Sequence, residues 1–155
     1  MALAGVSTLG ITFGYGTEST AGTKPNAFSE LTRINAIGGI SLENQTIDAS
    51  ALTSLVTETI AGRADTPGNV AVTVNLTPDT KKEWEDLIDD YNDLTDSKQM
   101  WFEVIIPGFT DSFFFIAQPP KQIPMPEINQ NELLTVEFSL TIVEYKGMDT
   151  KVAFT

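Results

Sequence analysis

The chain has 155 residues, of which 41% are hydrophobic, so it has the length and composition of one folded domain with a buried core. It contains no cysteine and no histidine, which excludes disulfides, thiolate nucleophiles, the usual zinc sites and the usual general base at neutral pH. The 21 acidic residues outnumber the 9 basic residues, and the resulting net charge of −12 disfavours binding to nucleic-acid phosphates.

The first 25 residues hold five of the eleven glycines and end in TESTAGTKP. This composition predicts an extended N-terminal arm over residues 1–25 rather than a helix or a core strand. No basic residue precedes Lys24, so a secretory signal is not expected. No apolar run in the sequence approaches the roughly 20 residues that span a bilayer, and therefore no membrane anchor is expected either.

Two strand-like segments flank a long connection. Residues 28–47 are predicted to hold one or two strands, and residues 70–76 alternate cleanly between apolar and polar positions. The intervening residues 48–69 greatly exceed the about two to five residues of an ordinary hairpin loop. They carry apolar side chains among polar ones, and such a segment tends to find its burial on something else.

The clearest helix is predicted over residues 78–92. Thr77 is a good N-cap, Pro78 suits the first helical position, and Asp79 favours the positive end of the helix dipole. One face carries an apolar stripe at helical spacing, and the other faces are acidic. The stripe consists of Trp84, Leu87, Ile88 and Tyr91.

The second half of the chain predicts three further strands. Residues 99–106 and 112–118 form a hairpin around the turn Pro107-Gly108, and Phe114 faces away from its neighbours, toward either a partner or the helix. The proline-rich stretch PPKQIPMP permits only an extended edge or a loop. Residues 133–145 alternate, with one buried face and one wet face that carries Glu137, Ser139 and Thr141.

No motif predicts catalysis, a cofactor or a bound metal. The segment GYGTES lacks the third glycine and the following helix of a dinucleotide loop. The acidic side chains of the helix lack the glycine-containing loop of a calcium site and are typical of a solvated surface. No pair of carboxylates and no Ser–Lys arrangement is singled out by its spacing. The chain is therefore not expected to be an enzyme.

These elements predict a mainly β (α+β) fold in one domain, residues 1–155. We expect a β-sandwich or partly closed barrel of about six to eight strands, with one amphipathic helix packed on it. A long loop at 48–69, an arm at 1–25 and a C-terminal tail at 147–155 extend from this domain. A β-domain with several apolar extensions is typical of a subunit in a repeating assembly.

The order of elements resembles that of the tail tube (major tail) proteins of long-tailed bacteriophages and of related phage-tail-like particles. The resemblance covers residues 30–147 as an arrangement of elements and includes no diagnostic motif. Its carriers are the strand–long loop–strand layout at 37–76, the helix TPDTKKEWEDLIDDYND, the hairpin MWFEVIIPGFTDSFFFIAQPP and the final strand NELLTVEFSLTIVEYKG.

The resemblance implies subunits that form hexameric rings, which stack into a tube in the virion tail after assembly in the host bacterial cytoplasm. The partners would be copies of the chain itself and other tail proteins, namely a terminator, a baseplate or tip protein and a tape measure. The loop at 48–69 would bridge stacked rings. Contacts between subunits would fall on the apolar side chains of the extensions, which are Leu9, Ile11, Phe13, Leu52, Leu55, Val56, Ile60, Val152 and Phe154.

The resemblance also implies a channel through which DNA passes without specific binding. Glu137, Ser139 and Thr141 are the candidate channel-lining residues. Carboxylate and hydroxyl groups suit such a wall, because cations on it would hold each passing phosphate.

Two alternatives remain open at this stage. The first is a β-sandwich module that binds carbohydrate, which would require exposed aromatic side chains, whereas we expect Trp84 and Trp101 to be largely buried. The second is another virion part of similar fold, such as a tail terminator or a head-decorating protein.

Overall fold

The computed structural model describes residues 10–40, 43–48, 59–65 and 68–154. For residues 43–48 and 59–65 it describes the course of the backbone. Nine strands and one helix lie within these ranges, and this helix is neither long enough nor apolar enough to cross a membrane. The elements are β1 (Thr12–Thr17), β2 (Ser29–Leu31), β3 (Ile34–Ile37), β4 (Glu43–Asp48), β5 (Thr59–Asp65), β6 (Asn69–Asn75), α1 (Pro78–Asn92), β7 (Met100–Ile105), β8 (Asp111–Gln118) and β9 (Thr135–Thr150).

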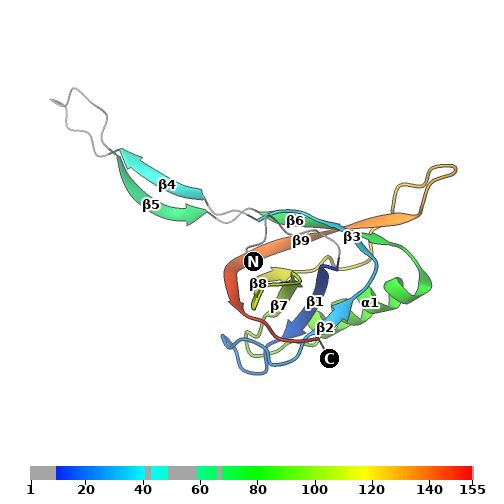
Figure 1. Ribbon diagram of the computed structural model, residues 1–155, viewed down its shortest axis with the longest axis horizontal. Coiled ribbons are helices and arrows are strands. Elements are labelled where there is room, and N and C mark those ends of the chain that lie inside the picture. The colour runs from blue at the N-terminus through cyan, green and yellow to red at the C-terminus, as the bar shows by residue number, and fades with distance from the viewer. Residues whose placement is uncertain (1–9, 41–42, 49–58, 66–67, 155) are drawn as a thin grey trace.

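Seven of the strands form one antiparallel sheet in the order β2-β1-β7-β8-β9-β6-β3. The remaining two, β4 and β5, pair with each other as a separate two-stranded ribbon. Figure 1 shows the ribbon projecting away from the sheet, and α1 lying beside β1 and β2. The predicted mainly β fold with one helix is confirmed, and the sheet is not closed into a barrel.

The long strand β9 joins the two halves of this sheet. Its first half pairs with β6, from Thr135 to Thr141, and its second half pairs with β8, from Thr141 to Thr150. The register shifts twice along the β8–β9 pairing, and Gly147 in β9 has a positive φ of 77°. Such irregularities bend a strand and let one sheet fold over itself. As a result β3 and β6 face β1, β7 and β8 across the core.

Alternation along the strands fills this core. Val70, Val72 and Val74 of β6 are buried, and so are four alternate residues of β9, as predicted. The β9 residues are Val136, Phe138, Leu140 and Ile142. The opposite face of this half of the sheet is polar, and Glu137, Ser139 and Thr141 are exposed on it. The expected wet face of the last strand is therefore confirmed.

Helix α1 covers one side of the core and has the bounds predicted from the sequence. Thr77 caps it through a capping box with Thr80, and Pro78 begins it. The indole of Trp84 stacks on Phe138, with 3.9 Å between ring centroids and an interplanar angle of 3°. Burial of a large aromatic pair contributes several kcal/mol, which explains why the helix stays on the sheet.

The N-terminal segment differs from its expectation. Residues 12–17 form β1, an interior strand between β2 and β7, and not part of an arm. Phe13 is a core residue that stacks on Phe102, so it cannot be an exposed contact with another copy. The glycines of β1 allow other chain segments to approach closely. A Cβ on Gly14 would touch the ring of Phe154 and lie 2.5 Å from the backbone oxygen of Ser29.

The C-terminal residues also lie on their own domain. They cover a second apolar cluster on the outer face of β7 and β8, formed by Phe28, Trp101, Phe114 and Ile116. Val152 and Phe154 pack against this cluster, and Phe154 makes a parallel bridge with Phe28. Phe114 is therefore covered by the terminal segments, neither by the helix nor left open to a partner. The expectation of a free tail at 147–155 is wrong, because β9 continues to Thr150 and the following residues are packed down.

A glycine substitution tests this close approach. We expect Gly14→Ala to lower the free energy of unfolding by about 1–3 kcal/mol, since its methyl group has no space beneath Phe154 and Ser29. Gly68→Ala is the matched control, because nothing lies within 4 Å of its added Cβ, and we expect a change within about 0.5 kcal/mol. Urea denaturation measures both. Equal stability of the two variants would contradict the packing described for β1.

Candidate assembly surfaces

The ribbon of β4 and β5 accounts for the long connection between the early strands. Its backbone register runs from Glu43 opposite Asp65 to Asp48 opposite Thr59, with one irregularity between Asn44 and Thr46. Residues 59–65, predicted to be loop, are therefore a strand. Among the described residues, the ribbon pairs with no strand of the main sheet. An isolated two-stranded hairpin is only marginally stable in water.

Some of the contact residues predicted for the long connection and for the N-terminal arm lie within the described residues, and others lie outside them. Ile60 lies in β5 at the position opposite Ile47. Leu52, Leu55 and Val56 lie outside the described residues. Leu9 of the predicted arm also lies outside them, whereas Ile11 is half-buried at the mouth of an apolar cleft.

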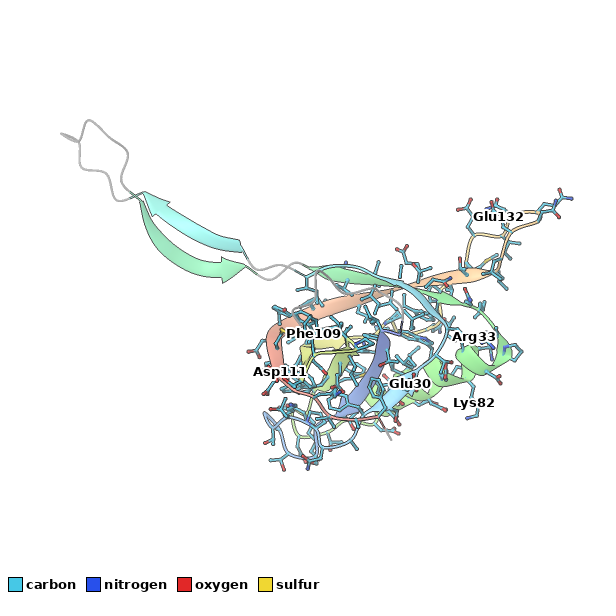
Figure 2. All side chains as sticks on the ribbon, viewed as in Figure 1. Glu30, Arg33, Lys82, Phe109, Asp111 and Glu132 are labelled. Atoms are coloured by element: carbon cyan, nitrogen blue, oxygen red, sulfur yellow. The ribbon has the colours of Figure 1, made fainter. Side chains whose placement is uncertain are left out.

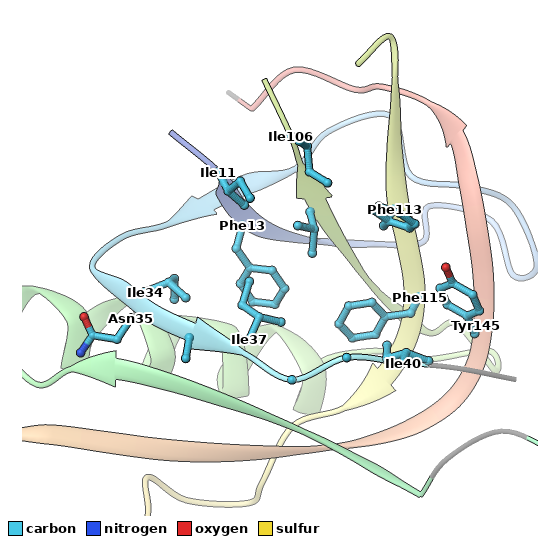
Figure 3. Close-up of a pocket in the computed structure, with 14 residues that line it drawn as sticks. Ile11, Phe13, Ile34, Asn35, Ile37, Ile40, Ile106, Phe113, Phe115 and Tyr145 are labelled. Atoms are coloured by element: carbon cyan, nitrogen blue, oxygen red, sulfur yellow. The ribbon is translucent and has the colours of Figure 1, made fainter. Parts of the chain in front are cut away.

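This cleft opens between the two halves of the folded sheet, at the end where β3 leads toward the ribbon (Figure 3). Its volume is about 620 Å³. The side chains that Figure 3 labels around it include Ile106, Phe113 and Tyr145, which come from three different segments of the fold. Among the residues that the structure describes, those that line the cleft are all uncharged. They are Ile11, Phe13, Ile34, Asn35, Ala36, Ile37, Gly38, Gly39, Ile40, Val104, Ile106, Phe113, Phe115 and Tyr145.

The proline-rich loop between β8 and β9, residues 119–134, lies at the other end of the molecule. Figure 2 shows Glu132 of this loop far from Phe109 and Asp111, which lie near the end with the ribbon. Met125 is 85% exposed, Ile128 67% and Leu133 71%. These exposed residues were not among those predicted from the sequence, and the only local signal for them is the presence of apolar side chains among prolines and polar residues.

The outer face of β6 and β9 is a third surface. Glu137 lies opposite Thr73 of β6, Ser139 opposite Ala71, and Thr141 opposite Asn69. Glu137 is the one charged residue in β6 and in the stretch of β9 from Thr135 to Ile142. The face is therefore polar and free of cations, which suits a wall that phosphates pass without being held.

The C-terminal segment is not available as a free contact surface, because two side chains tie it to the domain. Lys24 Nζ donates to the backbone oxygen of Thr150 at 2.6 Å, lies 3.5 Å from Asp149 and sits 4.1 Å from the centroid of the Phe114 ring. Glu103 accepts a 3.0 Å hydrogen bond from the backbone N–H of Val152. The proposed contacts through Val152 and Phe154 are thus satisfied within the same chain.

Glu103 is an unusual residue for this position. It is fully buried, and within the described residues neither its Oε1 nor the Oγ of the nearby Ser112 has a partner at good hydrogen-bond geometry. Burial raises the pKa of the Glu103 carboxyl above its ordinary value, and this effect outweighs the opposing influence of the Val152 N–H, the neighbouring Ser112 hydroxyl and the positive charges of Lys24 and Lys151. Ionisation of the Glu103 carboxyl therefore lowers the stability of the folded state.

Two other buried polar side chains, Glu18 and Tyr15, hold parts of the fold together through hydrogen bonds. Glu18 accepts hydrogen bonds from Trp101 Nε1 at 3.0 Å and from the backbone N–H of Gln99 at 2.7 Å, which fixes the turn after β1. Tyr15 donates to Asp90 of α1 at 2.8 Å, and burial together with this carboxylate raises the pKa of Tyr15. Within the described part of the chain, no group of three or more side chains is placed to hold a metal ion.

The burial of both tryptophans argues against a carbohydrate-binding site that uses their rings. Trp84 is 0% exposed and Trp101 5% exposed, as expected from the sequence. Neither can stack on a sugar from solution. The candidate functional surfaces of this mainly β protein are accordingly the ribbon, the cleft, the proline-rich loop and the polar face of β6 and β9.

Comparison with known proteins identifies similar folds. No protein-family model and no curated protein matches the chain. Among solved structures, a sheath/tube terminator of an extracellular contractile injection system superposes with a TM-score of 0.65 at 11% identity, over 97% of this chain and 100% of that one. The tube-terminating cap of the anti-feeding prophage gives 0.63 at 12% identity, over 97% and 95%.

A chain from the tail of an empty GTA particle, refined with C6 symmetry, gives a TM-score of 0.54 at 16% identity, over 91% of this chain and 95% of that one. At these identities the likeness is one of fold. It extends over nearly the whole of each chain, so the fold is shared as a unit and not as a fragment.

The buried carboxyl group gives a pH-dependent prediction. A carboxyl whose pKa is raised on folding binds more protons in the folded state, so its contribution to the free energy of unfolding falls as pH rises above its ordinary value of 4.5. We therefore expect Glu103→Gln to be more stable than the wild type at neutral pH, with the difference shrinking toward pH 4.5. Urea denaturation across this pH range measures it.

Glu132→Gln, on the exposed loop, is the matched control for the same change of side chain, and we expect its free energy of unfolding to stay within about 0.5 kcal/mol of the wild type. A Glu103→Gln variant that is less stable than the wild type at pH 7 would mean that the charged form is favoured in the fold.

Proposed function

We propose that the chain is a structural, non-catalytic subunit of a phage tail or phage-tail-like particle, which assembles with copies of itself into stacked six-fold rings that form a tail tube. The observation that carries this proposal is the β4–β5 ribbon, which projects from a well-packed domain and, in the described part of the chain, pairs with no further strand. A ribbon of this kind gains burial when it docks on a neighbouring copy.

The shared fold supports the same function. Proteins of this fold include a sheath/tube terminator of a contractile injection system, the tube-terminating cap of the anti-feeding prophage and a chain of a tail with C6 symmetry. In the proposed tube the polar face of β6 and β9 lines the channel, and DNA passes along Glu137, Ser139 and Thr141 without specific binding. The other tail proteins, namely a terminator, a tape measure and a baseplate or tip protein, would be the partners in the virion, which assembles in the host cytoplasm.

A terminator is the second candidate function, because two of the similar structures are described as terminators. The two functions differ in how the purified protein assembles. A tube subunit polymerises into long tubes of stacked rings, whereas a terminator forms a single ring that caps a tube made of another protein. Negative-stain electron microscopy of the purified chain separates them directly.

Removal of the ribbon tests its role. Residues 43–65 are replaced by an Asn-Gly turn, which can close the gap because Glu43 and Asp65 are paired neighbours. We expect thermal unfolding to stay within a few degrees of the wild type, since the ribbon pairs with no strand of the main sheet, while tube formation seen by electron microscopy is lost. Lys82→Ala, on the exposed face of α1, is the control that should still form tubes. Tubes formed without the ribbon would contradict the proposal.

The position of the polar face in the tube can be measured by labelling, because the chain has no cysteine of its own. In assembled tubes, we expect Ser139→Cys to react with a small maleimide but to be protected from a bulky polymer-linked maleimide, which enters a narrow channel poorly. Asp86→Cys, exposed on α1, should react with both reagents. Equal reaction of Ser139→Cys with both would place this face outside the tube.

A further inference from the structure

Two apolar features of the subunit are exposed to solvent and lie at opposite ends of the molecule. One is the cleft between the halves of the folded sheet, next to the root of the ribbon. The other is the proline-rich loop, residues 119–134, whose Glu132 marks the far end in Figure 2. A protrusion and a hollow at opposite ends of one molecule can meet only between two copies.

The proline-rich loop presents a preformed apolar protrusion, which is formed by Met125, Ile128 and Leu133. Met125, Ile128 and Leu133 are more than half exposed, which is unusual for three apolar side chains within nine residues. Pro119, Pro120, Pro124 and Pro126 restrict the backbone, so ordering the loop in a complex costs less conformational entropy. The stretch from Ile128 to Asn131 carries no charge.

The cleft is lined by uncharged and mostly apolar residues, which suit the apolar side chains of the loop. The fourteen described residues that line it are all uncharged, in a chain in which 19% of residues are charged. Depletion of charge at the centre is typical of protein–protein contacts. A volume of about 620 Å³ has room for several aliphatic side chains, and the cleft offers few polar groups to a small ligand.

We propose that the proline-rich loop of one copy inserts Met125 and Ile128 into the cleft of the next copy along the tube, against Ile106, Phe113 and Tyr145. This inference rests on the proposed function and adds the second half of the contact between rings. The interface is heterologous, since the two patches differ, and a heterologous contact along an axis repeats without closing. The cleft adjoins the root of the ribbon, so both contacts engage the same neighbouring copy.

Cross-linking between two single-cysteine variants tests the pairing, because any cross-link between them joins two copies. Ile128→Cys, carrying a tag that changes its length, is mixed with Ile106→Cys, assembled and treated with a short bis-maleimide. We expect the mixed dimer, identified by its size on a denaturing gel, to be the main product. Lys82→Cys in place of Ile106→Cys is the control and should give little mixed dimer.

Each other result overturns the inference in an identifiable way. Tubes without the mixed dimer leave the proposed function standing and refute this contact. A predominant product between two Ile128→Cys chains indicates a two-fold contact between loops. A mixed dimer that forms only after removal of residues 2–9 means that the chain's own N-terminal residues occupy the cleft. A protein that remains monomeric under all conditions refutes the proposed function and this contact together.

Negative charges introduced on the apolar protrusion of the loop test the contact independently, through their effect on tube formation. The double variant Met125→Asp, Ile128→Asp should lose tube formation while its thermal unfolding matches the wild type, since both side chains are exposed in the lone subunit. The double variant Asn129→Asp, Gln130→Asp adds the same charge to the same loop at exposed polar positions and should still form tubes. Loss of tubes in both variants, or in neither, contradicts the insertion of the apolar side chains.

Discussion

The double pairing of β9 is the constraint on which the rest of the fold depends. One strand holds β6 along its first half and β8 along its second, so two halves of a single sheet are hydrogen-bonded to the same backbone. β9 curves along the stretch where its register with β8 shifts (Figure 1), the two halves lie face to face, and the aromatic and branched side chains between them become a core without a second, separate sheet. The same bend leaves an opening at one end, which is the apolar cleft, and directs the start of β9 toward the opposite end, where the proline-rich loop lies. The positions of the apolar cleft and of the proline-rich loop both follow from this one arrangement.

Local patterns in the sequence predict the elements whose neighbours are close in the chain or whose burial is one-sided. The helix from Pro78 to Asn92 is predicted because its cap and its apolar stripe are local features. The strands β6 and β9 alternate because one face of each is buried and the other wet. The wet face with Glu137, Ser139 and Thr141 could thus be predicted, and its role in a channel depends on the assembly and not on the lone subunit.

Other elements could not be predicted because their cause lies far away in the sequence. Gly14 and Gly16 look like the residues of a loose arm, yet they are small because Ser29, Phe28 and Phe154 approach β1 from distant parts of the chain. The ribbon strands carry no alternating apolar pattern, since neither pairs with the sheet that encloses the core. The cleft gathers residues from β1, β3, β7, β8 and β9, and no single stretch of sequence indicates it. The sandwiching of Phe114 beneath the C-terminal residues is likewise a tertiary effect.

The two layers that cover β1, β7 and β8 have a consequence for motion in the subunit. These strands are buried on both faces, by the main core on one side and by the cluster around Trp101 and Phe114 on the other. Their amide hydrogens should therefore exchange with solvent only when the whole domain unfolds. The amide hydrogens of the proline-rich loop and of the ribbon should exchange through small local fluctuations. A rigid centre with compliant ends lets each copy adjust its contacts to its neighbours while the chain as a whole stays folded.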